Sequence, residues 1–112
     1  MKSQDPLLQA WEEILAQKGD SAAILGTKGG VARTFSQVEA QSRELAPKIE
    51  KFEPGSVIAV QIGNDPAWPE IFLACLRRSL VVLPLEQSIG ETERAGALRI
   101  CNASSVSIYL VF

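Results

Sequence analysis

The chain has 112 residues, of which 46% are hydrophobic, so its size and composition suit one globular domain or one piece of a larger domain. Its 13 acidic and 11 basic side chains give a net charge of −2, which argues against a nucleic acid partner, because no broad basic surface is available for phosphates. Histidine is absent, which excludes Ser/His, Cys/His and histidine–metal mechanisms within these residues.

The N-terminal stretch predicts an amphipathic helix and not a targeting signal. Asp5 is a candidate N-cap, and Pro6 suits the first helical position. The apolar residues that follow at helical spacing are Leu7, Leu8, Trp11, Ile14 and Leu15. No apolar run approaches the roughly 20 residues of a membrane-spanning helix, and no secretion signal is found. We therefore predict a soluble cytoplasmic chain without a membrane span.

A β-hairpin and a second helix are predicted next. "AAILG" and "VARTF" flank "TKGG", whose glycines allow the positive φ angles of a tight reversal. The loop lacks the spacing of a Walker loop and no helix follows it directly, so a phosphate loop is the weaker interpretation. Ser36 and Glu39 have capping-box spacing, and Pro47 predicts a kink or an early end of the helix. The predicted buried stripe is Val38, Ser42, Leu45, Ala46, Ile49 and Phe52.

From Ser56 onward the pattern predicts a parallel sheet. "SVIAVQIG" and "LVVLPL" are apolar enough for strands covered on both faces, the second ending at Pro84, and "SVSIYLVF" predicts a third strand. Asn64 or Asp65 is a candidate cap for the helix between the first two strands, with Pro66 near its first position. Ser88 and Glu91 repeat the capping-box spacing before another helix.

The fold class is therefore predicted as α/β, with an N-terminal helix and β-hairpin followed by a β-α-β-α-β parallel-sheet unit. Right-handed crossovers are expected in that unit. The predicted organisation is a single partial domain over residues 1–112. Residues 1–53 form the helix, hairpin and helix, and residues 54–112 form the parallel unit.

The candidate functional residues have structural explanations. "QIGNDPAWPE" stands where a nucleotide-binding turn would lie, but it holds one glycine and no GxGxxG motif, so capping explains Asn64 and Asp65 better than ligand binding. Arg77 and Arg78 are interpreted as solvated charges that complement a helix dipole, in preference to an anion site. The acidic residues assigned to the surface are Glu12, Glu13, Glu91 and Glu93.

The two cysteines, Cys75 and Cys101, are interpreted as buried reduced thiols, in preference to a disulfide or a reactive site. No Cys/His spacing typical of a metal site accompanies them. The sequence therefore predicts no catalytic residue, no cofactor-binding residue and no metal site. Pattern and composition alone indicate an α/β module without a recognisable active site.

Two stretches carry a family resemblance. "TFSQV", Thr34 to Val38, resembles a Thr-Tyr-x-Glu-Leu motif that opens a helix, and "PGSVIAVQIGNDPAWPEIFLACLRRSLVVLPLE" is similar to the block that follows it. Over about two thirds of its length the chain resembles the N-terminal part of an adenylate-forming (AMP-binding) superfamily enzyme and is acyl-CoA synthetase-like. It departs from the pattern at Ser56, where aspartate is common, at Glu86, where aspartate or asparagine is usual, and at Ser79. Glycine is usual at position 79 because it tolerates a backbone conformation that costs serine energy.

The resemblance implies that the full-length enzyme uses Mg-ATP to form an acyl-adenylate from a carboxylic acid and passes the acyl group to coenzyme A or a carrier thiol. The parts that do this lie downstream of the resembling region, so the chain is interpreted as a catalytically incomplete scaffold fragment that binds no cofactor by itself. A stand-alone, non-catalytic α/β binding or interaction module is the alternative, and half of a split enzyme is a third hypothesis.

The fragment interpretation also predicts partners. The apolar surfaces of "IFLACL" and "SVSIYLVF" are expected to be covered by self-association or by the remaining enzyme domains. The acyl substrate and the acceptor thiol cannot be predicted from these residues, because the resemblance places the acyl pocket downstream of them.

Overall fold

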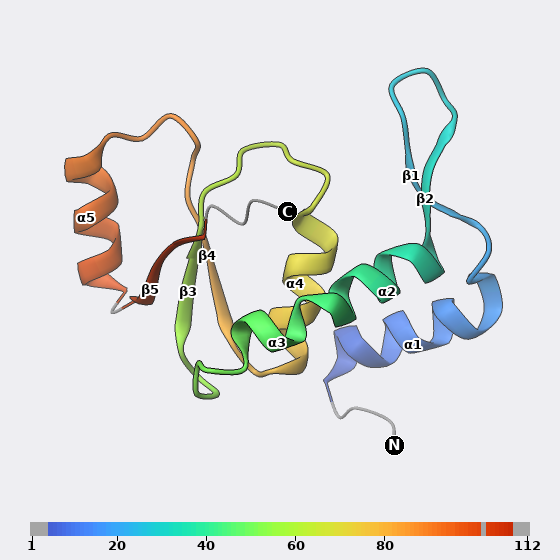
Figure 1. Cartoon of the computed structure of the whole chain (residues 1–112), viewed down its shortest axis with the longest axis horizontal. Helices are drawn as coiled ribbons and strands as arrows, with labels where there is room; N and C mark the ends of the chain where they lie inside the picture. The colour runs from blue at the N-terminus through green and yellow to red at the C-terminus, as the bar shows by residue number, and fades with distance from the viewer. Residues whose placement is uncertain (1–4, 102, 109–112) are drawn as a thin grey trace.

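Figure 1 shows the computed structural model, which describes residues 5–101 and 103–108. In chain order, the elements are α1 (Pro6–Lys18), β1 (Ala22–Leu25), β2 (Val31–Thr34), α2 (Phe35–Glu44), α3 (Ala46–Ile49), β3 (Val57–Val60), α4 (Trp68–Arg77), β4 (Val81–Pro84), α5 (Glu91–Ile100) and β5 (Ala103–Ile108). Strands β1 and β2 pair in an antiparallel hairpin, and β3 pairs in parallel with both β4 and β5. The predicted α/β fold class is confirmed.

Helix α1 begins as predicted, but it buries fewer side chains than expected. The Oδ1 atom of Asp5 accepts hydrogen bonds from the backbone N–H groups of Leu7 (2.8 Å) and Leu8 (3.2 Å). Leu8 is buried, whereas Leu7 and Ile14 are exposed. The hairpin that follows extends away from the helices, and Gly29 at its tip has a φ of 83° (Figure 1). The prediction of a glycine-dependent reversal is confirmed.

The predicted capping box of the second helix is wrong by two residues. The N–H of Gln37 donates to the Thr34 hydroxyl (3.1 Å), and the N–H of Thr34 donates to Gln37 Oε1 (2.8 Å). Thr34 ends β2 in an extended conformation, so the helix begins directly after the strand. The predicted early end of the second helix is confirmed, because α2 ends at Glu44 and Pro47 lies in the first turn of α3.

Strand β3 is the centre of the parallel sheet, in the order β4-β3-β5. Its residues Ile58, Ala59 and Val60 have no exposed surface, as predicted for a strand covered on both faces. The same prediction for "LVVLPL" is wrong, because β4 lies at the edge of the sheet and Val81 remains 53% exposed. The expected end of this strand at Pro84 is confirmed.

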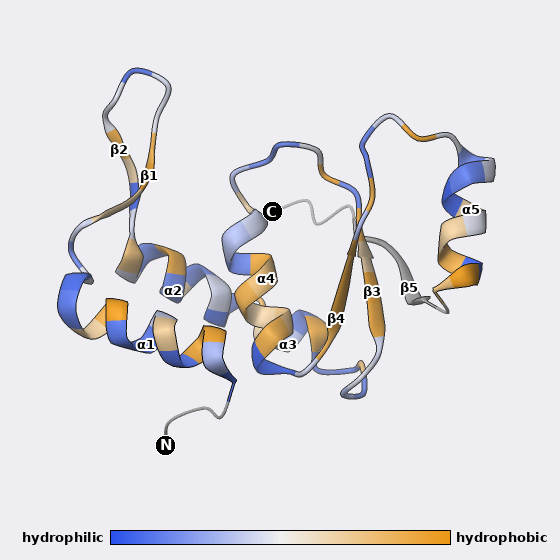
Figure 2. Cartoon of the chain, turned by 180° about the vertical axis from the view of Figure 1, so that it is seen from behind, coloured by the Kyte–Doolittle hydropathy of each residue, from blue (hydrophilic) through white to orange (hydrophobic). Residues whose placement is uncertain are grey.

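Helix α4 lies between the sheet and the N-terminal helices. On the sheet side, Ile71 and Cys75 pack with Ile58 and Val60, and on the other side Leu73 packs with Leu8 and Val38. Figure 2 shows α4 between the sheet and α2, with hydrophobic residues along much of its length. The expectation that "IFLACL" needs cover from outside the chain is therefore wrong except at Phe72, which is 43% exposed. The end of "SVSIYLVF", residues 109–112, lies outside the described residues.

Ser79 occupies the turn between α4 and β4 in a left-handed conformation, with a φ of 59°. It is the sole non-glycine residue with positive φ in the part of the chain that the structure describes. Its carbonyl accepts a hydrogen bond from the N–H of Gly55 (2.7 Å), which fixes the turn against the loop before β3. The backbone conformation typical of glycine is thus retained although the residue is serine.

Replacing Ser79 with glycine is expected to raise the free energy of unfolding by about 0.5–1 kcal/mol, because relief of the left-handed strain exceeds the added freedom of the unfolded chain. Urea unfolding followed by tryptophan fluorescence measures the change. The matched control is Ser79→Ala, which keeps the β carbon and should bring no gain. Equal stability of the two variants would contradict the strain argument.

Candidate functional site

The candidate site is a cleft at the carboxyl ends of β3 and β4. After β3 the chain turns into α4, and after β4 it turns into α5, which lies on the opposite side of the sheet (Figures 1 and 2). Ligands of open α/β sheets bind beyond the carboxyl ends of the strands, which is the edge where this cleft lies. The cleft has a volume of about 510 Å³ and is lined by Gly63, Asn64, Trp68, Pro84, Leu85, Glu86, Gln87 and Ser88.

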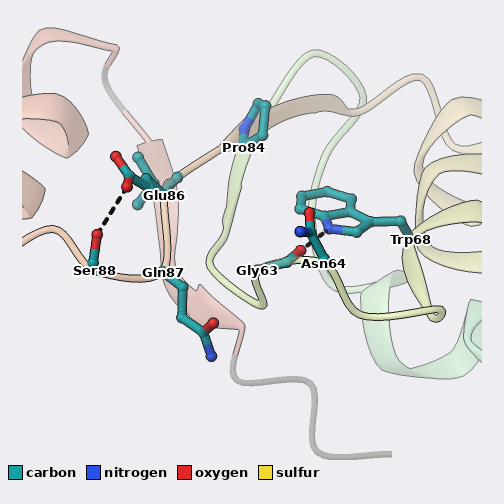
Figure 3. A pocket seen from close by; sticks show the side chains of 8 residues that line it. Gly63, Asn64, Trp68, Pro84, Glu86, Gln87 and Ser88 are labelled. Atoms are coloured by element: carbon teal, nitrogen blue, oxygen red, sulfur yellow. Dashed lines mark hydrogen bonds between the residues drawn. The ribbon is translucent and has the colours of Figure 1, made fainter.

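One wall of the cleft is built by the loop between β3 and α4. Trp68, the first residue of α4, donates from its indole Nε1 to the carbonyl oxygen of Gly63 at 2.6 Å (Figure 3). Gly63 has a φ of 64°, and a β carbon at this position would lie 2.4 Å from the Gln87 Oε1 of the opposite loop. The positive φ favours glycine at this position, whereas the exposed Gln87 side chain could turn away from a β carbon.

The opposite wall is held in place by a buried amide. Gln61, which is 6% exposed, donates from Nε2 to the carbonyl oxygens of Glu86 (3.0 Å) and Gln87 (3.1 Å). Its Oε1 accepts a hydrogen bond from Arg94 of α5 (2.9 Å). The sequence analysis missed this residue, although a single amide at the end of an apolar strand is a usable signal, because a buried amide requires partners.

The predicted helix caps around the cleft are wrong in detail. Helix α4 begins at Trp68 after Ala67, and the Asp65 carboxylate accepts from the Ala67 N–H (2.8 Å), so it holds the preceding turn and does not cap the helix. Asn64 lies in the cleft wall. Helix α5 has Gly90 as its N-cap, while the Ser88 hydroxyl donates to Glu86 Oε1 at 2.8 Å (Figure 3). Ser88 therefore shapes the cleft loop.

The two arginines at the end of α4 are not the solvated charges that were predicted. Arg77 donates to the Ser42 hydroxyl (2.5 Å) and forms an ion pair with Glu39. Arg78 donates to the backbone carbonyls of Phe52 (3.1 Å) and Glu50 (2.6 Å). Both side chains are half-buried because this end of α4 packs against α2 and the turn after α3. Their hydrogen bonds connect α4 to α2 and to the turn after α3, and neither residue lines the cleft.

Glu39, predicted as a capping residue, instead joins three helices. Its carboxylate accepts from Trp11 Nε1 of α1 (2.8 Å) and Arg43 Nε of α2 (2.7 Å), and it pairs with Arg77 of α4. Burial raises the pKa of this carboxyl, but these hydrogen bonds and the Arg77 charge outweigh burial, so the pKa lies below its ordinary value of 4.5. Glu39 is therefore ionised, and its carboxylate connects α1, α2 and α4.

The remaining candidate residues are dispersed. Cys75 is buried and reduced, as predicted, and burial raises the pKa of its thiol to about 11. Cys101 is also free, but it is exposed, because α5 buries none of its residues. Glu12 is half-buried, and the exposed carboxylates are Glu13, Glu91 and Glu93. Over residues 5–101 and 103–108, no group of three potential ligands could hold a metal ion, and no helix is long and apolar enough to cross a membrane.

The architecture is that of an open α/β unit with a cleft at the carboxyl edge of its parallel sheet. The model of the AMP-binding enzyme family matches residues 11–110, and the chain belongs to this family. The predicted resemblance to the N-terminal part of an adenylate-forming enzyme is thereby confirmed. A search of curated proteins finds no match.

Solved structures of adenylate-forming enzymes share the fold. An artificially fused adenylation–PCP di-domain, NpsA-ThdA of Klebsiella oxytoca, is 20% identical with a TM-score of 0.74, over 83% of this chain and 18% of that one. The N-terminal subdomain of NpsA from the same organism is 19% identical with a TM-score of 0.73, over 88% of this chain and 27% of that one. A benzoate CoA ligase from Burkholderia xenovorans is 17% identical with a TM-score of 0.72, over 84% of this chain and 19% of that one. The chain therefore spans between 18% and 27% of the length of these proteins.

Replacing Gly63 with alanine is expected to destabilise the chain by about 1–2 kcal/mol, because alanine resists the positive φ that this position adopts. Urea unfolding measures the loss, and the NMR signal of the Trp68 indole N–H reports the displaced loop. The control is Gly30→Ala, since a β carbon there meets nothing within 4 Å and φ is not positive. An equal loss in the free energy of unfolding of the two variants would show that the positive φ at Gly63 does not require glycine.

Proposed function

We propose that this chain is the N-terminal scaffold part of an AMP-forming acyl-CoA synthetase-like ligase, which activates a carboxylic acid through an acyl-adenylate. The observation that carries the proposal is the family match over residues 11–110. The benzoate CoA ligase among the similar structures supports the CoA-ligase class, with Mg-ATP and coenzyme A or a carrier thiol as the reactants of the whole enzyme. Residues 1–112 form one partial domain of that enzyme.

We infer that the chain does not catalyse adenylation by itself. Its share of the similar solved structures, 18% to 27%, leaves most of an adenylation enzyme outside these residues. Of the eight described residues that line the cleft, the one charged side chain is Glu86, a carboxylate that repels the phosphates of ATP. The scaffold role assigns no catalytic, cofactor-binding or metal-binding residue to the chain.

We also propose that the remaining enzyme domains or a second copy of the chain cover its exposed apolar side chains in the cytoplasm. The most exposed of these in the described residues are Leu7, Leu25, Val31, Phe72, Val81 and Ile100. Light scattering of the purified chain tests self-association. Growth of the mass with concentration supports it, whereas a monomer at every concentration shows that these side chains tolerate water.

The coding sequence beyond Phe112 tests the fragment proposal directly. An open frame that encodes a Ser/Thr/Gly-rich phosphate loop and the lysine of a small C-terminal domain is the expected result. The same two features in a separate neighbouring gene would indicate a split enzyme instead. A stop codon without such a gene would contradict both and favour the stand-alone, non-catalytic module.

A further inference from the structure

We propose that the β1–β2 hairpin and the β3–α4 loop open and close as one cooperative unit, and that Arg33 is the residue that joins them. The β3–α4 loop forms one wall of the cleft, so the order of this wall follows the state of the hairpin. Arg33 lies outside the described lining of the cleft and acts on it through Pro66 and Glu70, which makes it a positioning residue. Such coupling goes beyond the scaffold function and does not depend on adenylation.

The hairpin is an arm whose order depends on its inner end. Its outer end projects away from the helices, where the paired residues Leu25 and Val31 are 63% and 61% exposed (Figure 1). Two register shifts interrupt the pairing of its strands. At the inner end, Ile24 packs against the core between α1, α2 and α4, and the N–H of Phe35 donates to the carbonyl of Ser21 (3.1 Å). An isolated two-stranded ribbon is marginally stable in water, so we expect this arm to open locally.

Arg33 carries the charge that connects the arm to the cleft loop. From β2, its guanidinium donates to Gln41 of α2, pairs with Glu70 of α4 and donates to the carbonyl oxygen of Pro66 in the β3–α4 loop. The side chains of Arg33 and Glu70 are 14% and 9% exposed. Opening of the hairpin alone would leave the Glu70 carboxylate buried without its charge partner, which is costly. Opening of the loop and the first turn of α4 together with the hairpin exposes Glu70 to water and removes this cost.

The two acceptors of Arg33 in this segment, Pro66 and Glu70, lie on either side of Trp68 in the sequence. The Trp68 indole N–H donates to the carbonyl oxygen of Gly63 (2.6 Å), a hydrogen bond that spans the loop (Figure 3). It exists only while the loop is folded. Exchange of the Trp68 indole hydrogen with solvent therefore reports opening of the cleft wall.

Hydrogen exchange of the isotope-labelled 112-residue chain, followed by NMR, tests the coupling. Gly29→Ala places a β carbon at a φ of 83° at the hairpin tip, where it meets nothing within 4 Å, so it weakens the hairpin without contacting Arg33. Exchange of the Gly26 N–H, which donates to the carbonyl of Gly30 (2.7 Å), should become about fivefold faster. Exchange of the Trp68 indole hydrogen should become faster by the same factor.

Two further variants separate coupling from a general loss of stability. Gly55→Ala is the matched control, because Gly55 also has a positive φ, 90°, and open space around it, but it lies in the turn before β3. It should leave both exchange rates unchanged. In the double variant Arg33→Met with Glu70→Met, adding Gly29→Ala should still accelerate exchange at Gly26 but no longer at Trp68.

Equal acceleration of the Trp68 indole exchange by Gly29→Ala and Gly55→Ala would overturn the proposal, because the signal would then report global unfolding. So would a Gly29→Ala variant in which either the Gly26 or the Trp68 rate stays unchanged, and so would coupling that survives in the double variant. The scaffold function would stand in each of these cases, because it rests on the family match.

Discussion

Replacing Arg33 with methionine is expected to lower the free energy of unfolding by roughly 3 kcal/mol, because it leaves the carboxylate of Glu70 buried without its partner. Arg33 extends from β2 to α4, where it pairs with Glu70, and it also donates to Gln41 of α2 and to the carbonyl of Pro66. The two paired side chains are 14% and 9% exposed. A loss of this size is a large part of the stability of a small domain.

The control for this prediction is an ion pair whose arginine is exposed and whose carboxylate has other partners. Arg43 pairs with Glu39 four residues earlier in α2, but its side chain is 66% exposed, so Arg43→Met should cost under about 1 kcal/mol. In the double variant Arg33→Met with Glu70→Met, no unpaired charge remains, and most of the stability should return. Urea unfolding of all three variants is the measurement. If Arg33→Met is no more harmful than Arg43→Met, the hairpin is not tied to α4 by a buried charge pair.

Replacing Ile71 with alanine is the second large effect, with an expected loss of about 2–5 kcal/mol. Ile71 is 1% exposed and packs with Ile58 and Val60 of the central strand, so truncation leaves a cavity in the main core. Thermal and urea unfolding of the variant measure the loss in the free energy of unfolding. A variant that is already unfolded at room temperature would also be consistent with a loss of this size.

Phe72→Ala is the matched control, since this neighbouring side chain on α4 is 43% exposed and should cost under about 1 kcal/mol. The pair distinguishes internal cover of α4 from cover by another chain. If Phe72→Ala were as damaging as Ile71→Ala in the isolated chain, the outer surface of α4 would also be buried, which points to self-association through this helix.

The sequence was sufficient for the elements whose signals are local. Asp5 and Pro6 marked the start of α1, Pro47 marked the end of α2, and continuous apolar residues identified β3 as a strand covered on both faces. The capping box predicted at Ser36 failed because the same spacing occurs twice near the boundary, and the one predicted at Ser88 failed because α5 begins after Gly90, which provides no side-chain cap. The choice between Thr34–Gln37 and Ser36–Glu39 depends on where β2 ends, which is set by its pairing with β1.

The site was harder to predict because its geometry is tertiary. Gln61 and Gly63 gain their roles from the Glu86–Ser88 loop, more than 20 residues away, and this proximity follows from the pairing of β3 with β4. Arg77 was predicted as a solvated charge and Glu39 as a capping residue, because each helix was considered alone, but the two side chains meet where α2 packs on α4. The family motifs, in contrast, identified the membership that the match over residues 11–110 confirms.

The central claim is that this chain supplies scaffold and none of the adenylation chemistry. Exchange of labelled pyrophosphate into ATP, measured on the purified 112-residue chain with a panel of carboxylic acids including benzoate, tests it most directly. The account predicts no acid-dependent exchange above the background without protein. Exchange that depends on the acid, co-purifies with the folded chain and falls with Arg33→Met would contradict it, because these residues would then contain a complete adenylation site.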